Sequence, residues 1–347
     1  MASMSTAQSL VVPATRTAMD GTSGGALAGV EQRFRMQVLL DGAALGPLPG
    51  HSITDLAFRR DGQHLAAQQG GRVQATVRMS TTARPSSAAS PRFRDNHGAD
   101  EREVFSGEIV VPTSPALANR DGAQWTAPDA VVFALRDPFP YQSGTLCVEL
   151  AAAPVSGSAS PWWRIDYELF WHDAQVAATG AACDPLSNAF ASRNTLLPGG
   201  SLDLICSGPR GATGVLLLGT TPITPALSLD FLGAPDCYAG VVPAAAVAAP
   251  IQGGPVTERA AANLTLDLPC ESWLAGGQIL AQWAVFPNPR NPALLTTTKV
   301  LSLQIASSPS TLPGTLVRTG PLGNTEPWPA VGRVYPQLMP VVRLGYQ

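Results

Sequence analysis

Short runs in which polar and apolar residues alternate strictly are the feature that most constrains this fold. The clearest is RVQATVRMS at 72–80, and similar runs occupy 31–39 and 52–59. A period of two places successive side chains on opposite faces of a β-strand, so each run predicts a strand with one hydrated face. Glycine (33) and proline (32) make up about a fifth of the 347 residues. Both disfavour helix interiors, so we predict an all-β protein.

The strand-like runs fall into two sets with a polar, small-residue stretch between them. The first set continues at 103–111, 130–135, 146–150 and 163–171, and the second covers 201–206, 215–218, 226–232, 262–268, 278–286 and 297–305. This density of strands predicts two antiparallel β-sandwich or jelly-roll-like domains with little helix. The predicted boundaries are a flexible N-terminal segment at 1–28 with a possible first strand, domains at 29–180 and 181–306, and a Pro/Gly-rich tail at 307–347. We expect the last part of the tail to dock on the first domain.

Charge and hydropathy exclude several classes of protein. The net charge is −3 and only 14% of residues are charged, so no basic surface for nucleic acid is indicated. No apolar run reaches the roughly 18 residues of a membrane span. The first residues carry no basic segment followed by an apolar one, so a signal peptide is absent from the sequence as given. We expect that the signal peptide has been removed, or that the start codon has been assigned too late.

Residues 197–204 (LPGGSLDL), 214–219 (GVLLLG), 232–237 (LGAPDC) and 277–285 (GQILAQWAV) carry a resemblance to a known module. They resemble a β-sandwich module that recurs at the C-termini of secreted proteins of planctomycetes, myxobacteria and their relatives. Residues 53–150 resemble a second, uncharacterised module of exported bacterial proteins. Its marks are ITDLAFRRDG at 53–62, VRMSTT at 77–82, NHGADE at 96–101, VFSG at 104–107 and DPFPY at 137–141. The resemblance implies export and an extracellular or cell-surface role, and it carries over no catalytic residue.

The resemblance also bears on the five cysteines, none of which has CxxC spacing. In the C-terminal module a cysteine after Gly-x-x commonly accompanies the Pro-x-Cys, which implies a disulfide between Cys183 and Cys237. Cys206 and Cys270 lie in strand-like runs of the same domain, and we predict a second bridge between them. Cys147 is the odd cysteine, expected as a free thiol that is buried as a small hydrophobe. Its alternative role is to join neighbouring copies.

The segment 162–173, WWRIDYELFWHD, is the main candidate for ligand binding. On a strand, Trp163 and Trp171 share one face, and Asp166 and Glu168 take the other. With Trp162, the aromatic rings would form a platform for sugar rings beside two carboxylates. The alternative is a core strand whose acids face solvent. A glycosidase pair at Asp166 and Glu168 is disfavoured, because neighbours on one face of a strand seldom lie across a scissile bond.

No motif for metal or nucleophilic catalysis is well formed. His97 lies in a loop with Asp95 and Asp100, which makes these three the secondary candidates for a metal site holding calcium or a transition metal. The Asp-x-Asp spacing of calcium loops is missing, which favours an ordinary polar turn. Residues 21–25 match Gly-x-Ser-x-Gly but lack the flanking strand and helix of a nucleophile elbow, so we interpret them as a linker. No cofactor is predicted.

The sequence therefore favours a non-enzymatic exported structural or adhesive protein. Low charge, small residues and disulfides fit a self-assembling surface or filament subunit, in which the apolar strand at 9–14 would pair with a neighbouring copy. The first alternative is a carbohydrate-binding protein that binds polysaccharide on the aromatic platform. A hydrolase of unknown type is the least favoured alternative, because no nucleophile, base and orienting group can be named together. A viral jelly-roll capsid would need a basic arm, and residues 1–30 contain only Arg16 as a basic residue.

Overall fold

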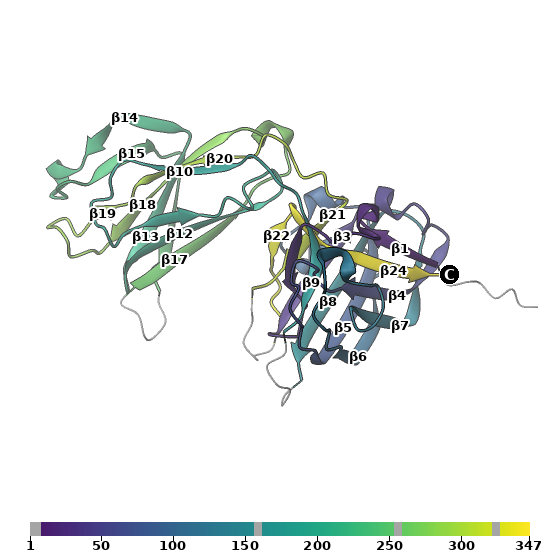
Figure 1. The fold of residues 1–347 in the computed structure, drawn as a ribbon. Coiled ribbons are helices and arrows are strands. Elements are labelled where there is room, and N and C mark those ends of the chain that lie inside the picture. Colours follow the sequence, from purple (N-terminus) through teal and green to yellow (C-terminus); the bar gives the residue numbers. More distant parts are fainter. Residues whose placement is uncertain (1–7, 156–161, 253–258, 321–326) are drawn as a thin grey trace, which may run out of the picture. The chain divides into compact units, whose positions relative to one another are not determined.

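The computed structural model describes residues 8–155, 162–252, 259–320 and 327–347. The chain divides into two compact units (Figure 1). Unit 1 comprises residues 1–171 together with 310–347, and unit 2 comprises residues 172–309. All strand pairs between the named strands are antiparallel, which confirms the predicted all-β class.

The largest sheet of unit 1 has six strands and brings the end of the chain against its beginning. Its central strands β3, β8 and β5 coincide with the alternating or apolar runs of the sequence, and β21 and β22 extend it with residues of the tail. The strand order is β22 (Arg333–Tyr335), β21 (Gly314–Arg318), β3 (Phe34–Leu40), β8 (Thr145–Pro154), β5 (Gly71–Thr82) and β6 (Arg102–Val111).

Two smaller sheets complete unit 1, and both contain strands from the two ends of the chain. The first has the order β1 (Gln8–Val12), β24 (Val342–Tyr346), β4 (His51–Arg59) and β7 (Ala130–Tyr141). The second has the order β2 (Ser23–Ala26), β9 (Arg164–Leu169) and β23 (Leu338–Pro340). The tail from Ser310 thus belongs to unit 1 through β21 to β24.

One hydrophobic core fills the space between the six-stranded and four-stranded sheets. Both sheets contribute their inward-facing residues, as a β-sandwich requires. The core includes Met36, Val77 and Leu150 from the first sheet and Leu56, Phe133 and Leu344 from the second. The side chains of Trp163 and Tyr167 on β9 belong to the same core.

The N-terminal segment is not a flexible linker, which corrects the prediction for residues 1–28 over their described part. β1 pairs with β24, and β2, which contains the Gly-x-Ser-x-Gly serine, pairs with β9. Glycine is required in β2, since a Cβ on Gly24 would collide with the Asp61 carboxylate and one on Gly25 with the Tyr167 ring. The small residues of β2 are therefore explained by the close packing of its backbone against Asp61 and Tyr167, not by flexibility.

Unit 2 contains a second set of antiparallel sheets. The largest has the order β10 (Gln175–Thr179), β20 (Val300–Gln304), β18 (Gln278–Phe286), β13 (Thr213–Gly219) and β16 (Ala245–Pro250), with β19 (Thr296–Thr297) beside β18. A three-stranded sheet contains β11 (Ala189–Ala191), β12 (Ser201–Pro209) and β17 (Arg259–Asp267). A hairpin is formed by β14 (Thr221–Ser228) and β15 (Tyr238–Val242).

The packing of unit 2 shows that its sheets share one interior. A Cβ on Gly208 of β12 would press on Val285 of β18, and Trp283 of β18 is fully buried. Strand β10 pairs with β20, so residues 175–179, which we predicted within the first domain, belong to unit 2. The alternating pattern is lost near residue 181, and we placed the domain boundary there. Unit 2 begins earlier, at His172, because β10 already belongs to it.

Helical structure in the described residues is limited to single 3-10 turns. They are η1 (Ala14–Arg16), η2 (Gly42–Leu45), η3 (Ser86–Ala88), η4 (Phe93–Asn96), η5 (Arg120–Gly122), η6 (Asp230–Leu232) and η7 (Ser272–Leu274). Within the described ranges, none of the helices has the length and apolar character needed to cross a membrane.

Candidate functional site: an arginine-lined cleft in unit 1

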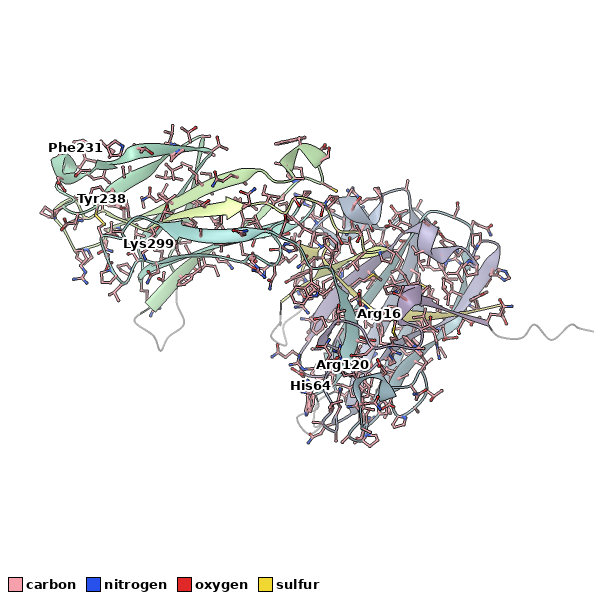
Figure 2. The ribbon with its side chains drawn as sticks, turned by 45° about the horizontal axis from the view of Figure 1, so that its top comes forward. Arg16, His64, Arg120, Phe231, Tyr238 and Lys299 are labelled. Carbon is pink, nitrogen blue, oxygen red and sulfur yellow. A yellow bond between two sulfur atoms is a disulfide. The ribbon has the colours of Figure 1, made fainter. Side chains whose placement is uncertain are left out.

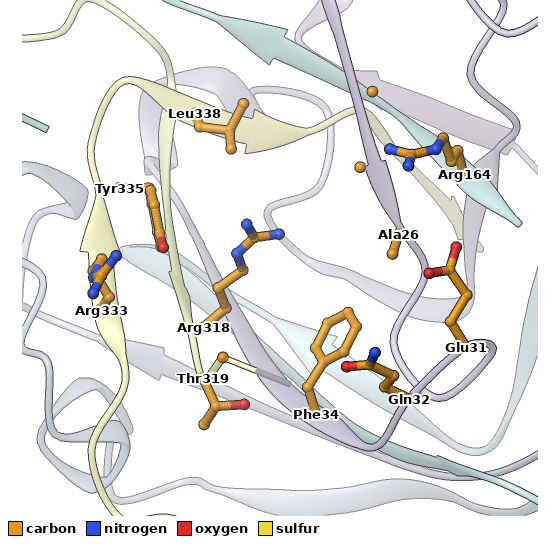
Figure 3. A pocket seen from close by; sticks show the side chains of 13 residues that line it. Ala26, Glu31, Gln32, Phe34, Arg164, Arg318, Thr319, Arg333, Tyr335 and Leu338 are labelled. Atoms are coloured by element: carbon orange, nitrogen blue, oxygen red, sulfur yellow. The ribbon is translucent and has the colours of Figure 1, made fainter. Parts of the chain in front are cut away.

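A cleft of about 470 Å³ opens where the β21–β22 edge of the six-stranded sheet meets the β2–β9–β23 sheet. Its walls come from segments that are far apart in the sequence, namely 24–34, β9, 318–320 and 333–338. Volumes of this order are typical of clefts that bind small ligands. We refer to it as the arginine cleft, because Arg164, Arg318 and Arg333 line it, while Glu31 is the one acid among its described lining residues (Figure 3).

Two of the three arginines face each other directly. Arg318 of β21 and Arg333 of β22 are partners in the antiparallel ladder, so their side chains leave the sheet on the same face. Directly opposed residues have Cβ atoms about 4.5–5.5 Å apart, and like charges at such positions destabilise a sheet. The fold therefore holds two positive charges together at the mouth of a cleft.

The surroundings of Arg318 hold its guanidinium in place as a cation. Its Cζ lies 5.1 Å from the centre of the Tyr335 ring, a cation–π contact. Burial lowers the pKa of Arg318, but the nearby hydroxyls of Tyr167 and Tyr335 outweigh this effect and raise the pKa overall. Burial also raises the pKa of the Tyr167 hydroxyl, so this phenol stays neutral. Arg318 is thus charged at every physiological pH.

Arg164 of β9 extends from the opposite wall (Figure 3). Over the described residues, neither Arg164 nor Arg318 forms an ion pair with a carboxylate within 4.0 Å. Several other arginines of unit 1 are ion-paired, as in Arg35 with Glu149 at 2.7 Å and Arg16 with Glu168 at 2.7 Å. Arg164 and Arg318 therefore bring positive charge to the cleft that no carboxylate of the described residues pairs with directly.

The remaining walls supply apolar surface and hydrogen-bonding groups. Phe34, nearly buried, and Leu338 line the cleft, and Figure 3 shows the Arg318 guanidinium between Tyr335 and Ala26. Glu31 and Gln32 lie at its exposed rim. The sequence reasoning missed this site, because its three arginines stand in three separate segments and each resembles an ordinary surface charge.

The predicted aromatic platform is not formed. Trp163 is fully buried, and its Nε1–H donates to Ser114 Oγ at 3.2 Å. Trp162 makes an edge-on contact with the His64 ring at 5.1 Å. Trp171 is 70% exposed and lies beyond the end of β9. β9 covers only Arg164–Leu169, so the three tryptophans lie outside it and their rings occupy different environments.

The two acids of the same segment are ion-paired inside unit 1. Asp166 is fully buried and pairs with Arg59 (Nη2–Oδ2, 2.6 Å), while Glu168 pairs with Arg16. The expectation that both acids face solvent is therefore wrong for Asp166. Neither carboxylate lines the arginine cleft. Their partners come from β4 and the N-terminal segment, so their role is to fix that segment against β9.

The candidate metal ligands do not converge. His97 hydrogen-bonds to Ser80 and Glu149, Asp100 accepts two hydrogen bonds from Thr81 (2.8 and 2.6 Å), and Asp95 accepts one from the Ser90 hydroxyl (3.1 Å). Across the described ranges, no group of three or more His, Cys, Asp and Glu side chains is placed to bind a metal ion. The two aspartates do not bond their own backbone as in the expected polar turn: Asp100 ties the loop to β5 through Thr81, and Asp95 contacts the Ser90 side chain.

The structure does assemble a serine, a histidine and a carboxylate that the sequence had not linked. Ser80 Oγ lies 2.9 Å from His97 Nδ1, and His97 Nε2 lies 3.1 Å from Glu149. Gly98 N–H donates to Ser80 Oγ (3.2 Å). Such a chain resembles the triad of serine hydrolases.

Burial argues against catalysis by this group. Ser80 is 0% exposed and the side chains of His97 and Glu149 are 4% exposed, so a substrate carbonyl has no path to the hydroxyl. Burial raises the pKa of Glu149, but hydrogen bonds from His97 and Arg35 outweigh it and lower the pKa overall. The group is a satisfied buried network that ties the loop after η4 to β3, β5 and β8.

The cysteines confirm one prediction and correct another. Cys183 and Cys237 form a disulfide. Cys206 and Cys270 are free, and Cys206 is buried while Cys270 is exposed. Cys206 pairs in register with Ala262 of β17, eight residues before Cys270. At about 3.4 Å per residue this separation far exceeds the roughly 7 Å that a disulfide spans.

Cys147 is a buried free thiol, as predicted. Burial raises its pKa well above the ordinary value, with the charges of Glu149 and Glu101 adding to the effect. An uncharged, inaccessible thiol is unreactive. The proposed alternative, that Cys147 joins neighbouring copies, is therefore wrong.

The β14–β15 hairpin of unit 2 carries a second surface of interest. Several of its large apolar side chains are exposed, and Phe231, at 71%, and Tyr238 lie together on this part of unit 2 (Figure 2). The set, which we call the hairpin surface, comprises Leu227, Phe231, Leu232, Tyr238 and Val242. The Cys183–Cys237 disulfide lies beneath it, in a small cluster with Leu229.

Comparison with known proteins adds no relative: no family model, no curated protein and no solved structure matches this chain.

Proposed function

We propose that this protein is an exported, non-enzymatic adhesive protein that binds a ligand in the arginine cleft. The observation that carries the proposal is a preformed cleft of about 470 Å³ lined by three arginines, two aromatic rings and one acid. These side chains can hold an anionic ligand, and Glu31 is the single carboxylate among them.

Two further observations support export. The Cys183–Cys237 disulfide indicates folding in an oxidising compartment. The resemblance of residues 53–150 and 197–285 to modules of exported proteins points the same way. Together they favour an extracellular or cell-surface location, where a binding protein would meet polymers of the cell envelope or matrix.

The proposal is tested by retention of the purified protein on columns of insoluble neutral and acidic polysaccharides. We expect retention on at least one polymer, reduced when the soluble form of the same polymer is added. If no polymer retained the protein and the protein degraded one of them, the adhesive function would be rejected in favour of an enzymatic one.

A second candidate function, subunit of a self-assembling surface layer or filament, is favoured by the hairpin surface. Its exposed apolar side chains stand on a hairpin whose charged residues are Asp230 and Asp236. The strand β14 carries Pro222 and Pro225, which block pairing with a further strand, so contact would be through side chains. Light scattering at increasing concentration tests this function. Growth of mass that Phe231→Ser abolishes supports assembly, and a monomer at all concentrations contradicts it.

A further inference from the structure

We propose that residues 16–22, which lead from η1 into β2 and which we call the N-terminal strap, form a pH-sensitive switch that is closed in acid and opens as the pH rises above neutrality. The proposal is carried by the contacts of three buried acids, Asp20, Asp61 and Asp166, with the strap and with β2. Its consequence for ligand binding rests on the proposed function, because β2 forms one wall of the arginine cleft.

The N-terminal strap is attached to unit 1 by polar contacts. Arg16, at the start of the strap, pairs with Glu168 of β9 at 2.7 Å, and Arg120 donates to the Gly21 carbonyl at 3.1 Å (Figure 2). No residue of the strap belongs to the hydrophobic core of unit 1, and Met19, its one large apolar side chain, is 50% exposed. The attachment of the strap therefore depends on the charge state of the groups that it contacts.

The three buried acids join the strap to two other segments. Asp166 Oδ1 on β9 accepts a hydrogen bond from the Gly21 backbone at 2.7 Å. Asp20, on the strap itself, accepts one from the backbone of Gly62, after β4, at 2.8 Å. The Asp61 carboxylate lies against the backbone of β2, where it leaves no room for a larger residue than glycine. The closed strap thus keeps all three carboxyls away from water.

Ionised carboxylates at these positions are poorly balanced by buried cations. Arg59, which is as buried as the acids, pairs with Asp166 at 2.6 Å. Asp20 Oδ2 is buried and accepts no hydrogen bond from the described residues, while Arg120, 3.5 Å from it, is 57% exposed. A buried carboxylate without a close partner is costly when it is charged. Opening the strap would hydrate these groups and remove that cost.

Other charged and titratable groups surround the three acids, and both signs are present among them. They are Arg16, Arg60, His64, Arg120, Asp121, Arg164 and Glu168. Arg60 is itself paired with Asp129 at 3.6 Å, and Arg16 is paired with Glu168. These two cations are therefore shared with acids outside the cluster.

The direction of the switch follows from the protons that the closed strap retains. Burial raises the pKa of each of the three carboxyls, and that of Asp166 rises from 3.8 to about 7, with the charge of Asp20 adding to the effect. Closure is therefore fully favoured below the ordinary pKa and weakens as the pH rises through 7. The titration of Asp166 alone makes opening about 10-fold easier at pH 9 than at pH 6.

Hydrogen–deuterium exchange of the full chain at pH 6 and pH 9, corrected for the intrinsic rates, tests the switch. Peptides covering 16–26 should exchange faster than those of the central strand β8 at both pH values, because the strap opens locally. Their protection should fall by about 10-fold between pH 6 and pH 9, since Gly21 N–H is bonded only while the strap is closed.

Asp20→Asn tests whether the acids cause the change. Asparagine keeps an oxygen for the Gly62 backbone but removes one charge of the cluster, so the fall in protection should shrink to about 3-fold. Asp121→Asn is the matched control, because Asp121 also accepts a hydrogen bond from the strap, from the Asp20 backbone at 3.0 Å, but is exposed. Its fall in protection should equal that of the unchanged protein. If Asp20→Asn does not fold, Asp61→Asn, which lies outside the strap, replaces it.

Retention on a polysaccharide that binds at pH 6 gives the second measurement. Because the strap leads into β2, its opening loosens a wall of the arginine cleft, so retention should weaken at pH 9 and weaken less in Asp20→Asn. This arm depends on the proposed function, whereas the exchange measurement does not.

The outcomes separate the switch from the proposed function. Equal exchange of strap and β8 peptides, or strap protection that is unchanged between pH 6 and pH 9, would overturn the switch. A fall in Asp20→Asn as large as in the unchanged protein would overturn the role of the acids. Retention that ignores pH while the strap opens would overturn its coupling to the cleft. Strap opening without retention on any polymer would confirm the switch and count against the proposed function alone.

Discussion

Arg59 and Asp166 form an ion pair in the interior of unit 1, with Nη2 and Oδ2 2.6 Å apart and both side chains almost inaccessible to solvent. The pair also fixes the N-terminal segment. Asp166 Oδ1 accepts a hydrogen bond from the Gly21 backbone (2.7 Å), and Arg59 donates to the carbonyl of Met19. Through these bonds, β2 is held in place at the arginine cleft.

Stability should fall as pH rises toward neutrality because of Asp166. Burial raises its pKa to about 7 from 3.8, although the bond from Arg59 opposes this. The folded state therefore binds a proton that the unfolded chain has released, and the stabilisation present at low pH is lost as pH rises from about 4 to 7. The melting temperature of the unchanged protein should decrease between pH 5 and pH 8.

Asp166→Asn provides the control for this prediction. At pH 8, where Asp166 is ionised, it should lower stability by about 3–5 kcal/mol, because Arg59 loses its buried charged partner. Asparagine does not titrate, so the melting temperature of the variant should depend less on pH over the same range. Thermal unfolding at four pH values for both proteins gives the comparison. If the melting temperatures of the two proteins changed in parallel with pH, Asp166 would not titrate between pH 5 and pH 8.

The disulfide of unit 2 should contribute measurably to its stability. It closes a loop with a sequence separation of 54 residues, and bridges of this kind stabilise by about 2–4 kcal/mol. Reductant, or replacement of both Cys183 and Cys237 by serine, should lower the midpoint of guanidinium unfolding. Cys270→Ser is the matched control, because this thiol is exposed and free. Equal midpoints with and without reductant would contradict the prediction.

Ser80 should not react as a nucleophile, despite its contact with His97. The hydroxyl is fully buried, and its hydrogen bonds to Gly98 and His97 are already made within the chain. A serine-directed fluorophosphonate should leave the folded protein unlabelled at this residue, as read by peptide mass spectrometry. Labelling that Ser80→Ala abolishes would instead favour the hydrolase alternative.

The strands were predictable where polar and apolar residues alternate, because such a strand has one buried and one exposed face. Alternation at 72–80 and 52–59 corresponds to β5 (Gly71–Thr82) and β4 (His51–Arg59), since each has one buried face. β2 could not be found in this way, because Gly24 and Gly25 are selected by the backbone's closeness to Asp61 and Tyr167. Such a requirement depends on tertiary neighbours that no local pattern encodes.

The arginine cleft was not predictable for a related reason. A strand register sets Arg318 opposite Arg333, and only the folded chain shows which residues are partners. The same holds for Ser80, His97 and Glu149, which come from two strands and a loop. The Trp162–Trp171 segment, in contrast, was recognisable as aromatic, but its strand position decided which ring is buried.

Two tryptophans of that segment should respond oppositely to truncation. Trp163→Ala should lower stability by about 3–5 kcal/mol, because the ring is fully buried in the core of unit 1. Trp171→Ala should change stability by less than about 0.5 kcal/mol, since that ring is 70% exposed. Polysaccharide retention should be unchanged in Trp171→Ala. If that variant folded normally but lost retention, sugar binding would depend on the exposed tryptophan and not on the arginine cleft.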